Sequence, residues 1–265
     1  MKIAIIGVGN LGHSIAKGIL GQGKDSFCDS LFLTKRNTKS IEDLGQYANV
    51  RITKDNLEAV RNSEIVILAI QPGQLKGVLE EIKGVIDPGK HTLISVITGR
   101  KIEDIAQVLE KEVAIIRCMP NTAIAVGQSM TCIAANKMGE EKIEQAKTIF
   151  NALGTTLCIE ERLMQAATVI CASGIAFWMR LIRATTQGAV QLGFHSEEAQ
   201  QLSMQTCLGA ASLLIQSGSH PEQEIDKVTT PSGCTNEGLN EMEHQGLSSS
   251  LIKGIVTSFE KINQI

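Results

Sequence analysis

The sequence predicts an α/β fold, in which an N-terminal Rossmann-type, mainly parallel sheet is followed by a C-terminal all-α dimerisation domain. Residues 1–20 read as a buried strand, a glycine-rich turn and a helix. Strand-like apolar runs then alternate with helical patterns as far as residue 159, which is typical of βαβ units. The character of the chain changes near residue 160, so we expect domains at 1–160 and 161–265.

The glycine turn has the G-x-G-x-x-G spacing of a dinucleotide-binding site. Gly7 permits a tight turn, Gly9 lets a pyrophosphate approach the backbone, and Gly12 allows the helix to pack closely on the strand. Asn10 and Leu11 lie at the start of that helix, whose free N–H groups favour phosphate. A tight turn that binds no ligand is the alternative interpretation.

The end of the second predicted strand, residues 31–34, favours NADP over NAD. An NAD enzyme usually carries Asp or Glu there to bind the ribose 2′-hydroxyl. This chain has its nearest acids, Asp25 and Asp29, at the opposite end of the strand. The residues at the expected position are Thr34, Lys35, Arg36 and Asn37. Two cations and two polar groups suit a 2′-phosphate, so we expect NADPH, with NAD as the second choice and a solvated basic loop as the alternative.

The other elements of the first domain follow in order. A third strand is expected at 50–53, and a short helix at 55–61 has Asn56 near its start. A buried strand over 64–70 ends where Pro72 stops the ladder. Further strands are expected at 92–96, 113–117, 129–134 and 155–159, and helices at 74–83, 102–110 and 140–153.

The segment from 163 to 221 reads as helices, broken near 173–174, 193 and 218, with Ser196 as an N-cap. Its charged residues are Arg180, Arg183, Glu197 and Glu198. Because a helical domain normally carries charge on its solvent face, we expect much of this surface to be buried against another subunit. A helix buried inside one larger core is the alternative.

Composition narrows the class of partners. The 265 residues carry a net charge of −3 without a basic block, which argues against nucleic acid and anionic membranes. The seven cysteines include no C-x-x-C pair and mostly lie in apolar runs, so we expect reduced, buried thiols in a cytoplasmic protein. The pattern predicts no metal site, no signal peptide and no transmembrane helix.

Four stretches together resemble pyrroline-5-carboxylate reductases: residues 6–12 (IGVGNLG), 69–72 (AIQP), 119–122 (MPNT) and 230–235 (TPSGCT). The resemblance covers nearly the whole chain. It implies NADPH-dependent reduction of 1-pyrroline-5-carboxylate to L-proline, the last step of proline biosynthesis, in a homodimer or higher oligomer with shared active sites. The residues that it adds to the cofactor site are Ala69, Ile70, Gln71, Pro72, Met119, Pro120 and Asn121.

The same resemblance places the substrate, a cyclic imino acid, at the loop 230–236. N–H groups at the start of the following helix, expected around 237–244, suit the substrate carboxylate. The resemblance implies that Thr235 forms a hydrogen bond with the ring nitrogen of the substrate. No side chain stands out as a general acid. The other residues assigned to this site are Thr230, Gly233 and Cys234. An ordinary turn that caps a helix is the alternative.

Several positions depart from the family pattern. Gln71 stands where the family usually has Lys, and Ser232 and Cys234 replace Gly and Thr. Phe177 replaces the usual Tyr of a second motif. These changes cluster at the expected substrate pocket. They leave open another NADP-dependent imine reductase, a β-hydroxyacid-type dehydrogenase, or a catalytically silent NADPH-binding regulator.

Overall fold

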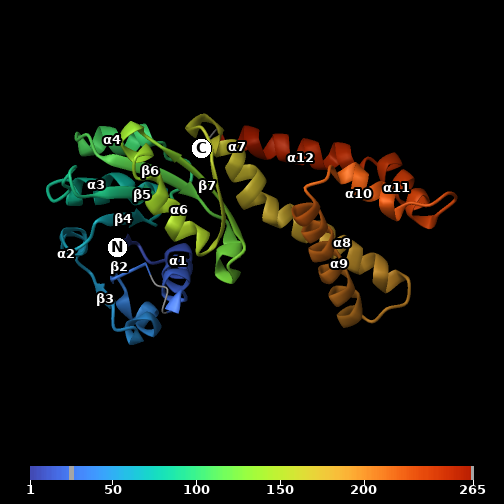
Figure 1. Ribbon diagram of the computed structural model, residues 1–265, viewed down its shortest axis with the longest axis horizontal. Helices are drawn as coiled ribbons and strands as arrows, with labels where there is room; N and C mark the ends of the chain where they lie inside the picture. Colours follow the sequence, from blue (N-terminus) through green and yellow to red (C-terminus); the bar gives the residue numbers. More distant parts are fainter. Residues whose placement is uncertain (24–26, 264–265) are drawn as a thin grey trace. The chain divides into compact units, whose positions relative to one another are not determined.

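The computed structural model describes residues 1–23 and 27–263, so Asp25 lies outside the described residues. The chain divides into two compact units, Met1–Ala172 together with the residues from Ile262, and Ser173–Lys261 (Figure 1). The division comes later than the expected boundary at 160 because Met164 and Val169 are buried in the first unit.

A mainly parallel sheet forms the N-terminal unit, as predicted (Figure 1). The order of the described strands is β3-β2-β1-β4-β5-β6-β7-β8, and only the β6–β7 pair is antiparallel. The strands are β1 (Lys2–Ile6), β2 (Ser30–Thr34), β3 (Val50–Thr53), β4 (Ile65–Leu68), β5 (Thr92–Ser95), β6 (Ala114–Met119), β7 (Ser129–Ala135) and β8 (Gly154–Cys158). The order reverses between β1 and β4, where the carboxyl ends of the strands open a crevice for a ligand.

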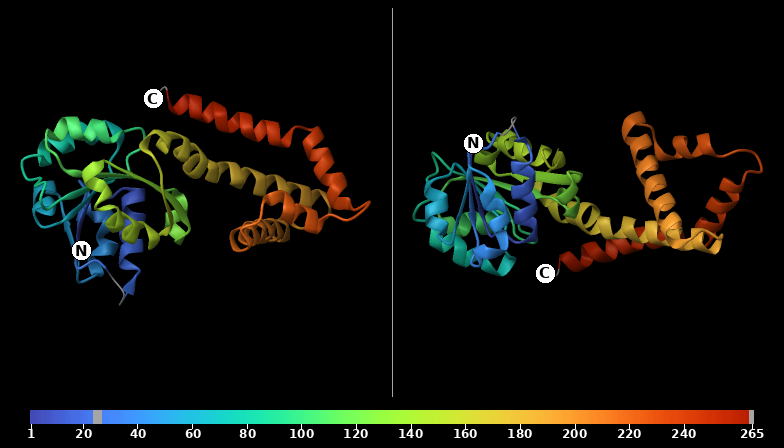
Figure 2. Two further views of the ribbon diagram at one scale, coloured as in Figure 1. Left: turned by 45° about the horizontal axis from the view of Figure 1, so that its top comes forward. Right: turned by 90° about the horizontal axis from the view of Figure 1, so that it is seen from below.

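Both faces of the sheet are covered by helices (Figures 1 and 2). In β4, Ile65 and Ile67 belong to one apolar cluster, whereas Val66 and Leu68 belong to another. Helices α1 (Asn10–Leu20) and α6 (Ile143–Asn151) contribute to the first cluster, and α3 (Leu75–Ile82) and α4 (Ile102–Leu109) to the second. Burial on both faces explains why the parallel strands read as unbroken apolar runs.

Several short helices connect these elements. They are η2 (Thr38–Gln46), α2 (Asn56–Arg61), η3 (Pro72–Gln74), η4 (Thr122–Val126), α5 (Lys137–Glu140), η5 (Glu161–Leu163), α7 (Met164–Ala167) and the π-helix η6 (Thr168–Ser173). The break expected near Ser173 is wrong, because η6 continues directly into α8 with helical dihedral angles at that residue. A π-helical turn absorbs the irregularity without ending the helix.

The second unit is entirely helical. Its helices are α8 (Gly174–Gln191), α9 (Ser196–Ser217), α10 (Pro221–Val228), α11 (Cys234–His244) and α12 (Leu247–Ile262). The predicted breaks at Gly193 and Gly218 are confirmed, and both glycines have positive φ. The predicted cap at Ser196 is wrong: His195 is the N-cap, and its N–H donates to Glu198 Oε2 at 3.0 Å.

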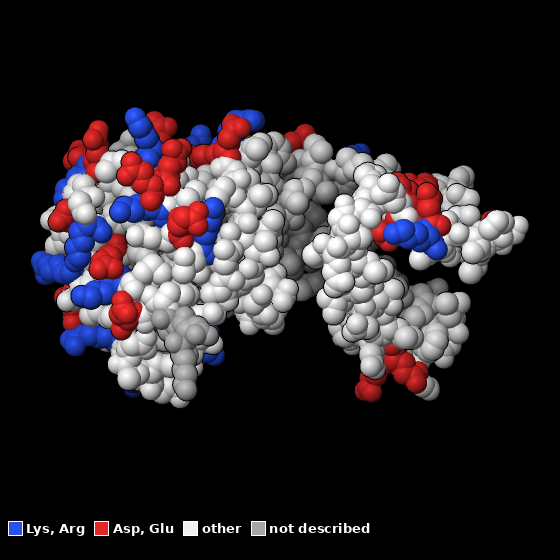
Figure 3. Space-filling model, in the orientation of Figure 1, with Lys and Arg blue, Asp and Glu red and all other residues white. Residues whose placement is uncertain are grey.

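The helical unit exposes many apolar side chains. The buried residues recorded in α8–α12 are Gly174, Ala199 and Ser203, whereas Ile215 is 82% exposed. On the face that Figure 3 shows, charged side chains crowd the N-terminal unit and are few on the helical unit. Surfaces of this kind are typical of obligate interfaces between subunits.

One stretch, Glu161–Gln191, is long and apolar enough by length and composition to cross a membrane, with a mean hydropathy of 1.4. Sequence analysis predicted no such stretch because it required an unbroken apolar run, whereas this one contains Arg180. An apolar helix that packs against a second subunit has the same composition.

The prediction that the cysteines are buried is only partly correct. Cys118 and Cys132 are buried, but Cys158 and Cys234 are exposed. Cys158 lies at the end of the edge strand β8, and Cys234 begins α11. Cys158 is exposed although Leu157 and Ile159 flank it, so apolar neighbours in the sequence do not ensure burial, and Cys234 follows Gly233 in a polar stretch.

Candidate active site

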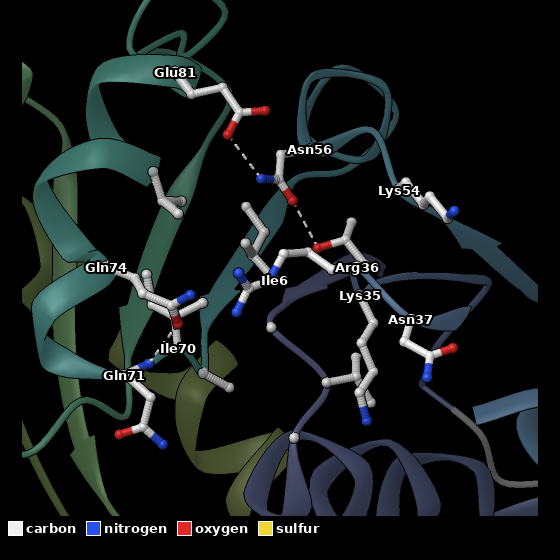
Figure 4. Close-up of a pocket in the computed structure, with 16 residues that line it drawn as sticks. Ile6, Lys35, Arg36, Asn37, Lys54, Asn56, Ile70, Gln71, Gln74 and Glu81 are labelled. Atoms are coloured by element: carbon white, nitrogen blue, oxygen red, sulfur yellow. Dashed lines mark hydrogen bonds between the residues drawn. The ribbon is translucent and has the colours of Figure 1, made fainter. Parts of the chain in front are cut away.

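A cavity of about 560 Å³ lies at the carboxyl ends of β1, β2, β3 and β4, where the strand order reverses (Figure 4). The residues that line it are Ile6, Gly7, Val8, Gly9, Thr34, Lys35, Arg36, Asn37, Lys54, Asn56, Ala69, Ile70, Gln71, Gln74, Val78 and Glu81. The cavity occupies the position at which open α/β sheets bind their ligands.

The glycine turn forms one wall of this cavity. Gly7 has φ +88°, and a Cβ there would collide with the side chain of Ile70. A Cβ on Gly12 would lie 2.9 Å from the carbonyl oxygen of Gly7, so α1 approaches the turn closely. Gly9 caps α1, and a Cβ there would meet no atom within 4 Å. Gly9 therefore leaves open space for a ligand, whereas Gly7 and Gly12 serve the fold.

The start of α1 offers N–H groups to an anion. The cap residue Gly9 has no side chain to bind them, and the first turn carries no acidic residue. The first N–H groups of a helix have no intrahelical partner. Asn10, Leu11 and Gly12 form this first turn but do not line the cavity with their side chains. Their backbone is the part suited to phosphate.

Three cations border the cavity at the ends of β2 and β3. Lys35 and Arg36 were predicted there, and Lys54 after β3 was missed. In Figure 4 the guanidinium of Arg36 extends into the cavity, while Lys54 points away from it. Asp29 lies at the far end of β2, where it accepts a hydrogen bond from the N-terminal amine at 2.6 Å. This acid is therefore not available to a ribose at the cavity.

A chain of hydrogen bonds crosses the top of the cavity in Figure 4. Thr34 Oγ1 donates to Asn56 Oδ1 at 2.7 Å, and Asn56 Nδ2 donates to Glu81 Oε2 at 2.9 Å. Asp55 fixes the start of α2, because its carboxylate accepts from the N–H of Glu58 at 3.0 Å. The cap therefore holds Asn56 in the first helical position, facing the end of β2.

The end of β4 forms the opposite wall. Ala69, Ile70 and Gln71 line the cavity, whereas Pro72 opens η3 and does not. The N–H of Gln71 donates to Gln74 Oε1 at 3.2 Å, which ties the strand end to the short helix. Gln71 carries no charge where the family pattern has Lys, but its amide still offers both a donor and an acceptor.

Met119, Pro120 and Asn121 lie at the end of β6 and do not line the cavity. Asn121 is buried, and its side chain binds the backbone at two places. Nδ2 donates to the carbonyl of Cys171 at 3.1 Å, and Oδ1 accepts from the N–H of Ala123 at 3.0 Å. In this structure Asn121 fixes η4 and η6, and its predicted role at the cofactor stays a prediction.

The loop 230–235 lies in the helical unit, where its shape is described by a hydrogen bond within the loop and by the backbone angles of its residues. The N–H of Gly233 donates to the carbonyl of Thr230 at 2.9 Å, and Ser232 has φ +58°. Helix α11 begins at Cys234, earlier than expected, because Gly233 is already the N-cap. Thr235 therefore stands in the first turn of α11, half-buried, beside the N–H groups that a carboxylate would use.

Comparison with known proteins gives consistent results for both units. A family model for pyrroline-5-carboxylate reductase dimerisation matches residues 161–265, and one described as NADP oxidoreductase, coenzyme F420-dependent, matches residues 2–99. Pyrroline-5-carboxylate reductase 2 of Dictyostelium discoideum is 43% identical over 98% of this chain and 91% of its own length. The chain belongs to the pyrroline-5-carboxylate reductase family.

Further members of the family agree along the chain. Pyrroline-5-carboxylate reductase 1 of D. discoideum is 46% identical over 98% of this chain, which spans 49% of that relative's length. A solved reductase from Coxiella burnetii is 28% identical, with a TM-score of 0.92 over 99% of this chain and 97% of its own. A Plasmodium falciparum structure with NADP bound, 24% identical, has the same fold, with a TM-score of 0.85 over 99% of this chain and 97% of its own. The fold, family and oxidoreductase class predicted from the sequence are confirmed.

The dimerisation match also bears on partners. It covers the stretch with the exposed apolar side chains of α8–α12 and the whole of the apolar stretch Glu161–Gln191. The match therefore supports a homo-oligomer and a small-molecule substrate. Within the residues that the structure describes, no group of three or more His, Cys, Asp or Glu side chains is arranged to hold a metal ion.

Four residues that line the cavity were not predicted from the sequence: Lys54, Gln74, Val78 and Glu81. Lys54 could have been found, because it follows a strand whose carboxyl end lies beside that of β2. Gln74, Val78 and Glu81 come from η3 and α3, and nothing in their own stretch of sequence indicates that this helix borders the crevice.

Proposed function

We propose that the chain reduces 1-pyrroline-5-carboxylate to L-proline with NADPH. The observation that carries the proposal is the cavity at the strand-order reversal, which combines an open Gly9 with the cations Lys35 and Arg36, in a chain of the reductase family. The nicotinamide, when bound, supplies a hydride to the imine carbon. The protein supplies the binding and orientation that bring the two reactants together.

The residues present fit NADP. The first turn of α1 and the space beside Gly9 suit the pyrophosphate, and Arg36 reaches into the cavity where a 2′-phosphate needs a cation (Figure 4). Asn56 and the backbone at Ala69–Gln71 are the polar groups that we assign to the two ribose rings. The predicted contributions of Met119, Pro120 and Asn121 belong to the same proposal, through the backbone at the end of β6.

We assign the substrate to the loop 230–235. The N–H groups of the first turn of α11 would hold the carboxylate, assisted by Thr230 and the backbone of Gly233 and Cys234. Glu237 lies in the same first turn, so its negative charge repels the substrate carboxylate. The hydrogen bonds from the N–H groups to that carboxylate must therefore be stronger than this repulsion. The substrate arrives already protonated as an iminium, so its ring N–H would donate to the Thr235 hydroxyl oxygen, and that hydroxyl can donate to the lone pair that forms on the nitrogen as hydride is transferred.

The decisive experiment follows NADPH absorbance, which should fall as NADPH is consumed with pyrroline-5-carboxylate and related cyclic imines, and is compared with NADPH formation from NADP+ and a 3-hydroxy acid. Thr235→Val keeps the branched shape and removes the hydroxyl. If the bond strengthens in the transition state, kcat/KM falls about ten- to a hundredfold, since a hydrogen bond to a charged group contributes roughly 1.5–3 kcal/mol. NADPH affinity should not change, and Thr235→Ser should recover most of the activity.

Three outcomes would contradict the proposal, each in a different part. Wild-type protein that binds NADPH but consumes none with any cyclic imine would be a silent binding protein. A folded Thr235→Val variant with wild-type kcat/KM would reduce the loop to a helix cap. Preference for the hydroxy acid would reassign the substrate class and leave the cofactor site in place.

We further propose a homodimer or higher oligomer formed through the helical domain 161–265, and a cytoplasmic location. The apolar side chains that α8–α12 expose support the first statement. The thiols of Cys158 and Cys234, exposed and without a disulfide, support a reducing compartment. Light scattering of the purified protein tests the oligomer directly.

A further inference from the structure

Glu81 carries a carboxylate at the rim of the cofactor cavity. Neither cofactor nor substrate binding, as proposed above, uses this carboxylate. It lies on α3 and accepts a hydrogen bond from Asn56 Nδ2 at 2.9 Å. Asn56 Oδ1 in turn accepts from Thr34 Oγ1 at 2.7 Å, so three residues from three elements form one chain (Figure 4). All three line the cavity.

The carboxylate fixes the direction of every bond in this chain. An ionised carboxylate only accepts, so the Asn56 amide must turn its nitrogen toward Glu81. Its oxygen then faces Thr34, and the Thr34 hydroxyl must donate its one proton to that oxygen. Without Glu81 the amide is free to rotate, and the Thr34 hydroxyl is free to donate elsewhere.

The fixed directions leave a defined pattern for a ligand. Asn56 retains one N–H donor, and Thr34 Oγ1 retains only acceptor lone pairs. Thr34 is 2% exposed, so its orientation is otherwise set by packing at the end of β2. A ribose hydroxyl both donates and accepts, and it matches this pattern of one donor beside one acceptor.

We propose that Glu81 is a positioning residue of the cofactor site, which acts through Asn56 to present this pattern to the adenosine ribose of the dinucleotide. The inference rests on the proposed function only in so far as the cavity holds a nicotinamide dinucleotide. It makes no use of the imine substrate.

The chain contains a matched control on the same helix. Glu80 precedes Glu81, does not line the cavity, and pairs with Lys83 at 2.7 Å. Removing Glu80 changes the charge of α3 by the same amount as removing Glu81, but leaves Asn56 untouched. Both glutamates are exposed, so neither substitution should prevent folding.

The experiment measures dissociation constants for NADPH and NADH by fluorescence titration, together with kcat and KM. Glu81→Ala should raise both dissociation constants and the KM for NADPH about fivefold, as for one hydrogen bond of ordinary strength, with kcat within about twofold. Glu81→Gln still accepts from Asn56 but also permits the reversed chain, and two equal orientations cost about twofold. Glu80→Ala should match the wild type.

A double-variant cycle tests the route through Asn56. If Glu81 acts only by orienting that amide, Glu81→Ala adds no further loss in an Asn56→Ala background. Additive losses, wild-type affinity in Glu81→Ala, or an effect of Glu80→Ala as large as that of Glu81→Ala would each overturn the inference.

The outcomes separate this inference from the proposed function. A wild-type protein that binds NADPH but reduces no imine removes the function and leaves the positioning role measurable by titration. A wild-type protein that reduces pyrroline-5-carboxylate, with Glu81→Ala binding normally, removes the positioning role alone. Failure of the wild type to bind either dinucleotide overturns both.

Discussion

Gly9→Ala should separate cofactor binding from folding. Gly9 has φ −80° and ψ −158°, a conformation that alanine adopts freely, and its new Cβ would meet no protein atom within 4 Å. Alanine reduces the entropy of the unfolded chain but is a poorer helix cap, and the two effects are of similar size. We therefore expect the free energy of unfolding to change by less than about 0.5 kcal/mol.

Gly7→Ala is the matched comparison on the same turn. Its φ of +88° is unfavourable for alanine, and the Cβ would collide with the Ile70 side chain. Backbone strain of roughly 1–3 kcal/mol adds to overpacking of roughly 1–3 kcal/mol, so at least about 2 kcal/mol of stability should be lost. For a chain of this size that loss lowers Tm by about 4–8 °C.

The two variants are compared by thermal unfolding without ligand and by NADPH titration. Gly9→Ala should unfold like the wild type and bind NADPH at least about tenfold more weakly, because the methyl group occupies space that the pyrophosphate approaches. Wild-type NADPH affinity in Gly9→Ala would refute the assignment of that space. A fall in Tm as large as that of Gly7→Ala would refute the reasoning from local geometry.

Three further predictions concern charge, assembly and pH. Arg36→Asp should weaken NADPH far more than NADH, whereas Lys39→Asp, in η2 and outside the cavity, should not; a wild type that prefers NADH would contradict this. Leu213→Asp should disrupt the oligomer seen by light scattering, because an unpaired charge is costly to bury in an interface, and a stable wild-type monomer would refute the model. Burial holds the pKa of His91 below its ordinary value of 6.5, so as the pH falls below that value the unfolded chain binds a proton before the folded chain does. The urea midpoint should therefore hold above about pH 6.5 and decline below it, and His91→Gln should flatten the decline; equal pH profiles would refute the assignment.

The sequence was sufficient for the parts of the site that are set by local chemistry. Gly7 and Gly12 are needed for close contacts within the turn and with the residues that follow the neighbouring strand β4, and the G-x-G-x-x-G spacing reflects that need. The same holds for Lys35 and Arg36, which follow directly from the end of β2. Glu81 and Lys54 are less predictable, because their places at the cavity depend on the order of the strands. Lys54 follows β3, which pairs with β2, and Glu81 lies on the helix after β4, which pairs with β1.

Errors in the prediction also have local physical causes. Ser196 is a good cap by composition, but the preceding His195 has the extended backbone and Glu198 lies at the right distance to bind its N–H. Residues 173–174 were expected to break the helix, whereas a π-helical turn ends at Ser173 and the helix continues from Gly174. For the cap, the two neighbouring choices differ by about 1 kcal/mol, which composition alone does not resolve.

The substituted loop 230–235 has a backbone conformation that favours glycine at the one position where the family pattern has glycine and this chain does not. Ser232 stands where the family has Gly, and its φ of +58° is the conformation that glycine adopts without cost. Serine holds it at a cost of roughly 1 kcal/mol, so contacts around the turn must impose the shape. Cys234 replaces a hydroxyl with a weak donor at the first residue of α11. The strong side-chain donor that remains in this first turn at a family position is the Thr235 hydroxyl, which is why the proposed chemistry depends on it more heavily here than the family pattern alone would suggest.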